Sequence, residues 1–536
     1  MVSSAHPLAT QAGLDILAEG GNAFDAAVAV AAALNVVEPM MSGIGGYGAT
    51  VVYDAEKGET RFLETGSRMP ETLDPSVFQP PTPNYTENRC GAKAVSTPGN
   101  VKAWETLSND YGELEWRRLF DPAIDLAEGG FVLGGTTAGW IDAAFSHFPE
   151  HAKSIYGNNG VPLRAGERLV QKDLARSLGL IAEQGAGAVY GGELGRAIDA
   201  TMREEGGFLT IDDLRNNRAQ WRDTVSIDHR GYEVVTASPP STSWNALLRL
   251  GVMSQFDPAA LGHNSVAYLH TLTEVNKQAS QAARGFFTAD PETQLAQLDL
   301  LLSRGYWADI AANINPSQAT PPASLGQPFG APAPCPPRSY TGTYAPTNAP
   351  DGQSHTTHFV VADKEGNVVS TTQTLGTVFG SKVMPQGTGI WLNDAISWLR
   401  FEPTGSNVFS VSPGRQSLYA LCPILVMSDG RPWIAIGTPG GRTIPQTTAQ
   451  MLMNLINFDM DVQQAIAAPR ISFLSPNRLM AEAGVPGPVR GGLSALGHNV
   501  EVEERGLGNA HGLAIEYEPE GNPVRFTGGA DPRGEG

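Results

Sequence analysis

The chain has 536 residues, more than one simple hydrophobic core usually contains, so two domains or one large layered domain are expected. Its 41% hydrophobic residues, 61 glycines and 39 prolines are typical of a loop-rich globular protein and not of a fibrous or disordered one. The net charge of −19 argues against a nucleic-acid partner or an anionic membrane, because either would select a basic surface.

The cysteines and the apolar segments exclude further classes. Cys90, Cys335 and Cys422 cannot all pair with one another and form no CxxC motif, so neither a disulfide scaffold nor a structural zinc site is expected. The longest apolar stretch, residues 23–37, is shorter than the roughly 20 residues needed for a membrane span. No signal peptide is visible, which leaves a cytoplasmic protein, or a secreted or periplasmic one with its signal removed, as alternatives.

The first 65 residues predict two helices followed by two strands. Apolar residues at helical spacing from Leu8 to Glu19 stop at a Gly-Gly pair. Asn22 is placed to cap a second helix over residues 23–37, which is apolar nearly all round and should be buried. The strand patterns ATVVYD and TRFLET follow.

Between the second helix and the first strand, GIGGYG matches the dinucleotide pattern G-x-G-x-x-G through Gly43, Gly45 and Gly48. That fingerprint requires a strand before it and a helix after it, and here the order is reversed. A tight glycine turn between buried elements is therefore the preferred interpretation.

The middle of the chain is predicted to be mostly helical, from Trp104 to about Phe256 and again over residues 265–313. Within it, HFPEH (147–151) matches the H-x-x-E-H metalloprotease pattern. Pro149 lies between the two histidines and would break the helix that such a zinc site needs, so a metal site is not expected there.

Residues 314–355 change in character, because they contain many prolines and few apolar side chains and cannot build a core. From Thr356 onward the chain becomes β-rich, which places the strongest internal boundary at this residue. Strands are predicted in HFVVAD, NVVSTTQT, GIWLND, PILVM and PWIAIG, then a helix over IPQTTAQMLMNLINF and late strands in NVEVEE and GLAIEYE.

Thr356 opens the first of these strands, and the turn DKEGN joins it to the second. If Ala362 pairs with Val368, residues whose numbers sum to 730 face each other, and Thr356 lies opposite Thr374 on one face. Two facing threonines are more often a structural pair than a catalytic one.

The position of Thr356 after a flexible linker favours the catalytic hypothesis. Its hydroxyl can attack the preceding carbonyl, and cleavage would free an α-amine with an ordinary pKa of about 7.7–8.0, suited to act as the base. The glycine turn in AIGTPGGRT follows a strand and precedes a helix, so Gly440 and Gly441 are candidates to present backbone N–H groups to an oxyanion.

At these residues the sequence resembles the gamma-glutamyltransferase family of N-terminal nucleophile hydrolases. The resemblance runs through nearly the whole chain. It is carried in order by HPLATQAGLDILAEGGNAFDAAVAVAAALNVVEP, STPGNVKAWETL, TTHFVVADKEGNVVSTTQT, QGTGIWLND, GTPGGR, AAPR (467–470) and DPR (531–533).

The resemblance implies an α/β (α+β) fold, a four-layer αββα sandwich, and self-cleavage between His355 and Thr356. Chains 1–355 and 356–536 would then form a heterodimer. It assigns Thr356 as nucleophile and α-amine base, Thr374 as its hydroxyl partner, and Gly440 and Gly441 as the oxyanion hole. The substrate implied is a small-molecule amide, with no cofactor and no metal.

The chain departs from the family where true gamma-glutamyl enzymes bind the glutamyl group. The serine pair that contacts the α-carboxylate is replaced by Tyr419-Ala420. The Asn, Gln and Asp that hold the α-ammonium are replaced by Gly376, Ala395 and Trp398. A charged group buried without a partner costs several kcal/mol, so a different acyl group is expected.

Arg68, in GSRMP, matches the family arginine that contacts a carboxylate, slightly displaced. We therefore expect a flatter and more aromatic acyl pocket that still binds one carboxylate. The alternatives are an ordinary gamma-glutamyltransferase or glutathione hydrolase, and a catalytically dead or nucleotide-binding protein on the same fold.

Overall fold

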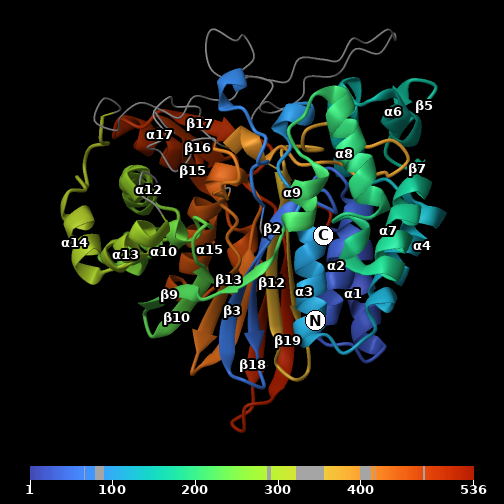
Figure 1. The fold of residues 1–536 in the computed structure, drawn as a ribbon. Coiled ribbons are helices and arrows are strands. Elements are labelled where there is room, and N and C mark those ends of the chain that lie inside the picture. The colour runs from blue at the N-terminus through green and yellow to red at the C-terminus, as the bar shows by residue number, and fades with distance from the viewer. Residues whose placement is uncertain are drawn as a thin grey trace.

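In the computed structural model, the described residues are 1–65, 67–78, 90–286, 291–321, 355–398, 412–416, 418–474 and 477–536. Two six-stranded antiparallel sheets lie face to face at the centre (Figure 1). In order, the first sheet consists of β1 (Val2–Ser3), β11 (His355–Ala362), β12 (Val368–Gly376), β2 (Tyr47–Asp54), β3 (Glu59–Glu64) and β8 (Gln220–Arg222). The second consists of β19 (Pro523–Ala530), β18 (His511–Tyr517), β14 (Arg431–Gly437), β13 (Ile424–Ser428), β10 (Tyr232–Ala237) and β9 (Thr224–His229).

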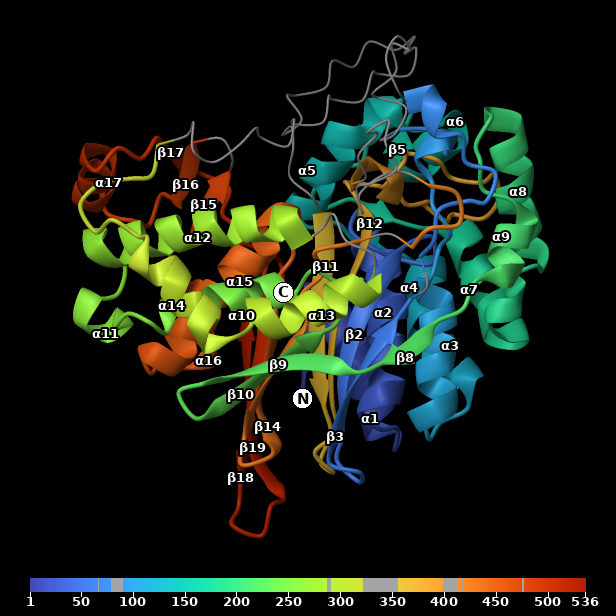
Figure 2. The same ribbon diagram turned by 60° about the vertical axis from the view of Figure 1, so that its left-hand side comes forward.

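Helices cover the outer face of each sheet, as Figure 2 shows from the side. The first sheet packs against α1 (Pro7–Ala18), α2 (Ala23–Val37) and α3 (Asn100–Tyr111), while α4 (Asp121–Gly129) contacts α2 and α7 (Lys172–Gln184) contacts α4. The second packs against α10 (Trp244–Met253), α12 (Val266–Phe286) and α15 (Ile444–Asn457). The result is the predicted four-layer αββα sandwich.

Smaller elements complete the two ends. The remaining helices are α5 (Gly135–Ala144), α6 (Glu150–Tyr156), α8 (Glu193–Glu205), α9 (Ile211–Asn216), α11 (Pro258–Leu261), α13 (Pro291–Leu301), α14 (Arg304–Ala312), α16 (Val462–Ala467) and α17 (Gly487–Ala495). The remaining strands are β15 (Ile471–Leu474), β16 (Arg478–Glu482) and β17 (Val500–Glu503), with the short pairs β4 (Phe131–Val132) and β7 (Arg168–Leu169), and β5 (Gly157–Asn158) and β6 (Val161–Pro162).

The predicted start of the chain is confirmed. Asn22 caps α2 through a capping box with Asp25, and every residue of α2 is buried. GIGGYG lies between α2 and β2, in the helix–turn–strand order that argues against a dinucleotide site. A Cβ at Gly45 would collide with the carbonyl oxygen of Trp391, so close backbone packing accounts for this glycine.

The HFPEH segment is also interrupted as predicted. A 3-10 helix ends at His147, and α6 begins only at Glu150. His151 makes a hydrogen bond of 2.8 Å between its Nε2 and the carbonyl oxygen of Met384. The two histidines therefore do not share a helix face.

One expectation about secondary structure was incomplete, and another was wrong. The region predicted as mostly helical up to Phe256 contains β8, β9 and β10 over residues 220–237, where β9 and β10 form a hairpin around Arg230 and Gly231. GIWLND is not a strand. Within it Leu392 makes only an isolated bridge to Gly45, because the neighbouring Asn393 bonds to loop backbone.

Part of the predicted linker, residues 322–354, lies outside the described residues, as does Cys335. Cys90 is disulfide-bonded, and Cys422 is free and buried. Among the described helices, none is both long and apolar enough to cross a membrane.

A buried ion pair joins the segment after α16 to the end of β19. Arg470 Nη2 lies 2.7 Å from Asp531 Oδ2, and their side chains are 1% and 0% exposed. Asp531 also accepts a hydrogen bond of 2.7 Å from the Ala510 N–H. Burial acts to raise the pKa of Asp531, but the charges of Arg470 and Arg533 outweigh it and hold that pKa below its ordinary value.

We predict that Asp531→Ala lowers the free energy of unfolding by roughly 3–5 kcal/mol, because it leaves a buried guanidinium unpaired. Since the folded pKa of Asp531 is lowered, its contribution is present above the unfolded pKa and is lost as the pH falls through the folded value. The difference between wild type and variant, measured by denaturant titration, should shrink in acid. Glu516→Gln, in an exposed pair with Arg525, is the matched control and should change stability by about 0–1 kcal/mol. Equal losses of stability in both variants would contradict the stabilising role of the buried Arg470–Asp531 pair.

Candidate active site

The two predicted threonines meet as the register of the hairpin requires. Thr356 pairs with Thr374 and Ala362 with Val368 across β11 and β12, which confirms the predicted register. The Thr356 hydroxyl donates a hydrogen bond of 3.2 Å to Thr374 Oγ1, and both residues are 2% exposed. Thr374 Oγ1 also accepts a bond of 2.8 Å from the Gly376 N–H, which fixes the oxygen in place.

The strand pairing is irregular at the predicted cleavage site. The register shifts between His355 and Thr356, so that His355 lies opposite Gly376 and not Leu375. Such bulges kink a strand locally and are common beside active sites, where they re-aim a side chain. The peptide bond before Thr356 therefore lies at an irregular point of an otherwise regular hairpin.

The face that carries the threonine pair looks toward the second sheet. Alternation places His358 two residues along β11 on the same face, where its Nδ1 lies 2.8 Å from Thr372 Oγ1. Burial, and secondarily the neighbouring His511, hold the pKa of His358 well below its ordinary value. His358 is therefore neutral. His358 was not among the predicted site residues, although the spacing in TTHF already placed it on the face of Thr356.

The predicted oxyanion glycines follow the end of β14, close to the threonine strand. A Cβ at Gly437, the last residue of β14, would collide with the His358 ring, so the two strands touch there. Gly440 and Gly441 have φ angles of 135° and 57°, which favour glycine, and they open a 3-10 helix that leads into α15. Neither backbone N–H donates a hydrogen bond to another residue in the described part of the chain.

Tyr419 forms a wall beside the threonine pair. Tyr47 lies directly opposite Thr374 in the sheet, and its ring centroid is 6.0 Å from that of Tyr419. Tyr419 is 5% exposed, and its hydroxyl has no hydrogen-bond partner among the described residues. Burial raises the pKa of Tyr419 well above its ordinary value, an effect that Glu64 strengthens and Arg222 partly offsets. The phenol is therefore a neutral donor.

For the other predicted binding residues, Arg68, Ala420 and Trp398, the described part of the structure shows no direct contact with the threonine pair. Arg68 is half-buried and forms an isolated backbone bridge with Gln416, in the segment that leads to Tyr419. Ala420 is half-buried beside Tyr419. Trp398 ends a 3-10 helix that starts at the buried Ala395, and its side chain lies outside the described part of the structure.

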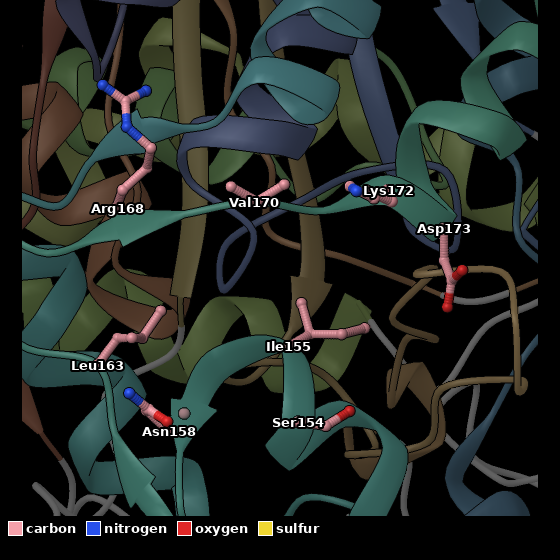
Figure 3. A pocket seen from close by; sticks show the side chains of 9 residues that line it. Ser154, Ile155, Asn158, Leu163, Arg168, Val170, Lys172 and Asp173 are labelled. Carbon is pink, nitrogen blue, oxygen red and sulfur yellow. The ribbon is translucent and has the colours of Figure 1, made fainter.

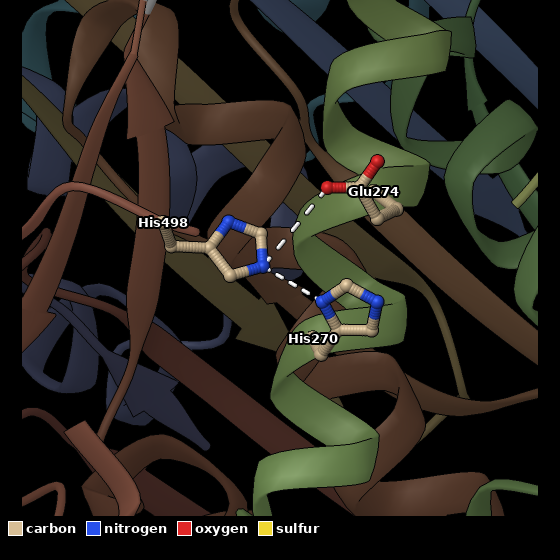
Figure 4. Close-up of side chains that lie close together, drawn as sticks. All are labelled: His270, Glu274 and His498. Carbon is tan, nitrogen blue, oxygen red and sulfur yellow. Dashed lines mark hydrogen bonds and ion pairs between the residues drawn. The ribbon is translucent and has the colours of Figure 1, made fainter. Parts of the chain in front are cut away.

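A histidine–glutamate cluster has the chemistry of a metal site (Figure 4). Ligand atoms of His270, Glu274 and His498 lie within 4.8 Å of one another, and His270 Nδ1 is 2.8 Å from His498 Nε2. The Lys277 ammonium, however, lies 2.7 Å from Glu274 Oε1, and both side chains are 0% exposed. Because Lys277 already neutralises Glu274, a further cation would be buried beside a positive charge. The cluster is satisfied as a hydrogen-bond network.

A depression of about 430 Å³ lies elsewhere on the surface, between α6 and α7 (Figure 3). It is lined by nine residues between Ser154 and Asp173, among them Arg168 and Lys172. None of the predicted site residues reaches it, so it is not the site of the threonine chemistry.

Comparisons with known proteins agree with this geometry. A model of the gamma-glutamyltranspeptidase family matches residues 9–536. The chain is 33% identical over 531 residues to the glutathione hydrolase proenzyme of Bacillus subtilis (strain 168), covering 97% of this chain and 88% of that protein. It is 35% identical over 551 residues to the acylase ACY 1 proenzyme of Pseudomonas sp. (strain V22), covering 99% and 94%. The crystal structure of cephalosporin acylase from Bacillus halodurans is similar with a TM-score of 0.85 at 29% identity, covering 100% of this chain and 94% of that one.

The layered fold and these matches define an enzyme of the N-terminal nucleophile hydrolase class, which hydrolyses amides or transfers their acyl groups. The chain belongs to the gamma-glutamyltranspeptidase family.

We predict that Thr374→Val leaves the fold intact but slows both chain cleavage and turnover. It removes the oxygen that accepts from Thr356 and from the Gly376 N–H, a loss of roughly 1–3 kcal/mol. Thr371→Val on the same strand is the matched control. It removes a buried hydroxyl whose oxygen lies 3.0 Å from Thr50 Oγ1, so it also breaks a threonine pair, but one that does not contact Thr356. Rates are followed by denaturing gel and by amide hydrolysis. If Thr374→Val keeps wild-type rates, or if both variants lose the same amount, Thr374 has no specific role in cleavage and turnover.

Proposed function

We propose that this chain is a precursor that cuts itself between His355 and Thr356 and then hydrolyses or transfers an acyl group other than gamma-glutamyl. The observation that carries the proposal is the hydroxyl pair of Thr356 and Thr374 at the start of β11, 3.2 Å apart and buried. Both curated relatives are named as proenzymes, which supports the cleavage step.

In the cleavage step, Thr356 Oγ1 attacks the carbonyl carbon of His355, and the bond from that carbon to the Thr356 nitrogen breaks. The acyl group moves to the hydroxyl oxygen and the nitrogen takes up a proton. Water then hydrolyses the ester, which leaves a carboxylate on His355 and a free α-amine on Thr356.

In turnover, the α-amine accepts the hydroxyl proton as Thr356 Oγ1 attacks the amide substrate. We assign Gly440 and Gly441 to bind the oxyanion through their N–H groups. The leaving amine takes a proton, and water or an acceptor amine then releases the acyl group from Thr356.

The cut would divide the chain into residues 1–355 and 356–536, which stay together as a heterodimer. β11 and β12 lie between β1 on one side and β2 on the other, and both flanking strands come from the first segment. Sheet hydrogen bonds on both sides therefore hold the second segment in place.

For the substrate, we infer a small amide whose acyl group carries a carboxylate and no α-ammonium. Gly376, Ala395 and Trp398 offer no charged acceptor for an ammonium group. The aromatic wall of Tyr419 and the guanidinium of Arg68 suit a flat or extended acyl chain with one negative charge.

We predict that purified protein shows two bands on a denaturing gel and that Edman sequencing of the smaller band begins TTHF. Thr356→Ala should give one uncut band without turnover, because no nucleophile remains, whereas Thr356→Ser should still be cut. A single band in active wild-type protein would rule out self-cleavage at this site.

We also predict a higher kcat/KM for glutaryl than for gamma-glutamyl 4-nitroanilide on the processed enzyme. The two substrates differ only in the α-ammonium, which would enter the pocket without the family's acceptors. A clear preference for the gamma-glutamyl compound would instead identify an ordinary glutathione hydrolase.

A further inference from the structure

The oxyanion loop, residues 438–441, begins where a side chain of the nucleophile strand touches it. Gly437 ends β14 and directly precedes the loop. A Cβ on Gly437 would collide with three ring atoms of His358, so the glycine backbone lies against this ring. Gly437 does not have the positive φ angle of Gly440 and Gly441, so the approach of the ring, and not the backbone conformation, accounts for a glycine here.

The His358 ring belongs to the same hairpin as the two hydroxyls. His358 lies two residues after Thr356 on β11, on the same face, and is 0% exposed. Its Nδ1 lies 2.8 Å from Thr372 Oγ1, and its Nε2 has no hydrogen-bond partner among the described residues. Thr372 lies two residues before Thr374 on β12. One hydrogen bond within the hairpin therefore orients the ring, which projects toward the second sheet.

The oxyanion loop is short and is held beyond Gly437. The Gly440 carbonyl accepts bonds of 3.1 Å from the Thr443 N–H and 2.9 Å from the Thr443 hydroxyl. The buried Thr438 hydroxyl donates a bond of 3.0 Å to the Pro439 carbonyl. Three residues of chain span at most about 11 Å, so a displacement of Gly437 is transmitted to Gly440 with little slack.

Oxyanion catalysis is sensitive to such displacements. The donor N–H groups must lie about 2.7–3.1 Å from the position that the oxyanion occupies, and the loss of one donor costs roughly 100- to 1,000-fold in kcat. A misplacement of about 1 Å, caused by a change outside the site, can cost on the order of 100-fold. The space that the His358 ring fills between β11 and β14 therefore matters for the reaction.

We propose that His358 is a positioning residue, whose ring sets the distance between the Thr356 hydroxyl and the oxyanion loop. Thr372 orients the ring, and Gly437 is the point at which the ring contacts the loop. This role rests on the proposed function, because it requires Thr356 as the nucleophile and the oxyanion loop as the source of the N–H donors.

The first test is His358→Asn on processed enzyme, with glutaryl 4-nitroanilide as the substrate. Asparagine retains an amide that can bond to Thr372 but lacks the outer part of the ring, so Gly437 loses its support. We expect kcat to fall roughly 10- to 100-fold. KM should change little, because acylation and deacylation pass through tetrahedral states in the same oxyanion hole and both become slower.

A tetrahedral probe separates misplacement of the oxyanion loop from a general loss of structure. In 3-carboxypropylboronic acid, boron replaces the carbonyl carbon of the glutaryl group. The Thr356 oxygen bonds to boron, its proton passes to the α-amine, and a hydroxyl oxygen of the anionic adduct lies where the oxyanion would lie. The inhibition constant should rise in His358→Asn by about the same factor as kcat falls.

A double-mutant cycle tests the contact between the ring and the loop. Gly437→Ala adds a methyl group that collides with the His358 ring and should lower kcat roughly 10- to 100-fold. In the double variant Gly437→Ala/His358→Asn, the methyl group enters the space that the ring has left. The double variant should therefore lose less than the product of the two single losses, because changes at residues in contact are not additive.

His229→Asn is the matched control. His229 is also a buried histidine, with Nε2 3.1 Å from Asn457 Oδ1 and with Nδ1 lacking a partner among the described residues. It lies on the edge strand β9, with β10 and β13 between it and β14. In this variant kcat and the inhibition constant should equal those of wild type.

If His358→Asn yields no processed protein, Thr372→Val takes its place. It removes only the bond that orients the ring and should lower kcat by a smaller factor. An unchanged kcat or inhibition constant, or losses that simply multiply in the double variant, overturn the role of His358, as does an equal loss in His229→Asn. A wild-type protein that stays uncut or hydrolyses no anilide contradicts the proposed function instead.

Discussion

The candidate active site depends on the register of one hairpin. Asp363 and Asn367 close the turn between β11 and β12 through bonds of 2.9 Å from the Asn367 N–H and 2.8 Å from its side-chain amide. The same Asp363 carboxylate accepts the Ala23 N–H at the start of α2, 2.9 Å away. A slip of one residue would turn Thr374 to the opposite face. Six residues of strand, about 20 Å, separate Thr356 from this turn. The turn therefore fixes which residue faces Thr356, although it lies far from the hydroxyl pair.

The surroundings of Thr356 favour neutral groups. Burial lowers the pKa of His511 to about 4, and the pKa of His358 is lowered as well. On the helix side of β11, burial raises the pKa of Glu38 to about 8, although Thr357 opposes the shift. All three groups are pushed toward their uncharged forms. An amine freed at Thr356 would meet the same low polarity, which favours the neutral base that the proposed mechanism needs.

Local signals in the sequence were sufficient for the parts of this site that depend on short-range structure. The turn residues of DKEGN were enough to predict the register of the hairpin. The glycines of GTPGGR were enough to predict a tight turn, and Gly440 and Gly441 have the positive φ angles that favour glycine. The pairing of strands that lie far apart in the chain could not be predicted from such local signals. Tyr47 faces Thr374 because β12 pairs with β2, and these two strands lie more than 300 residues apart in the chain. Strands β8, β9 and β10 lie in a region that was predicted only as mostly helical, so their places in the two sheets were not predicted either.

The two ends of the segment 322–354 are held by independent structures. At one end, the Thr320 N–H and hydroxyl both donate to Glu274 on α12, and Lys277 donates to the Thr320 carbonyl at 3.2 Å. His270 Nε2 bonds the Asn315 carbonyl at 2.7 Å in the same way. At the other end, β11 pairs with β12 from His355 onward, and further along, at Val360 and Val361, it also pairs with β1. A cut before Thr356 would therefore break one covalent bond without releasing either anchor. The buried charges of α12 thus have a structural task that explains their burial without a metal: they hold the first segment where it leaves the fold, while the sheet holds the second.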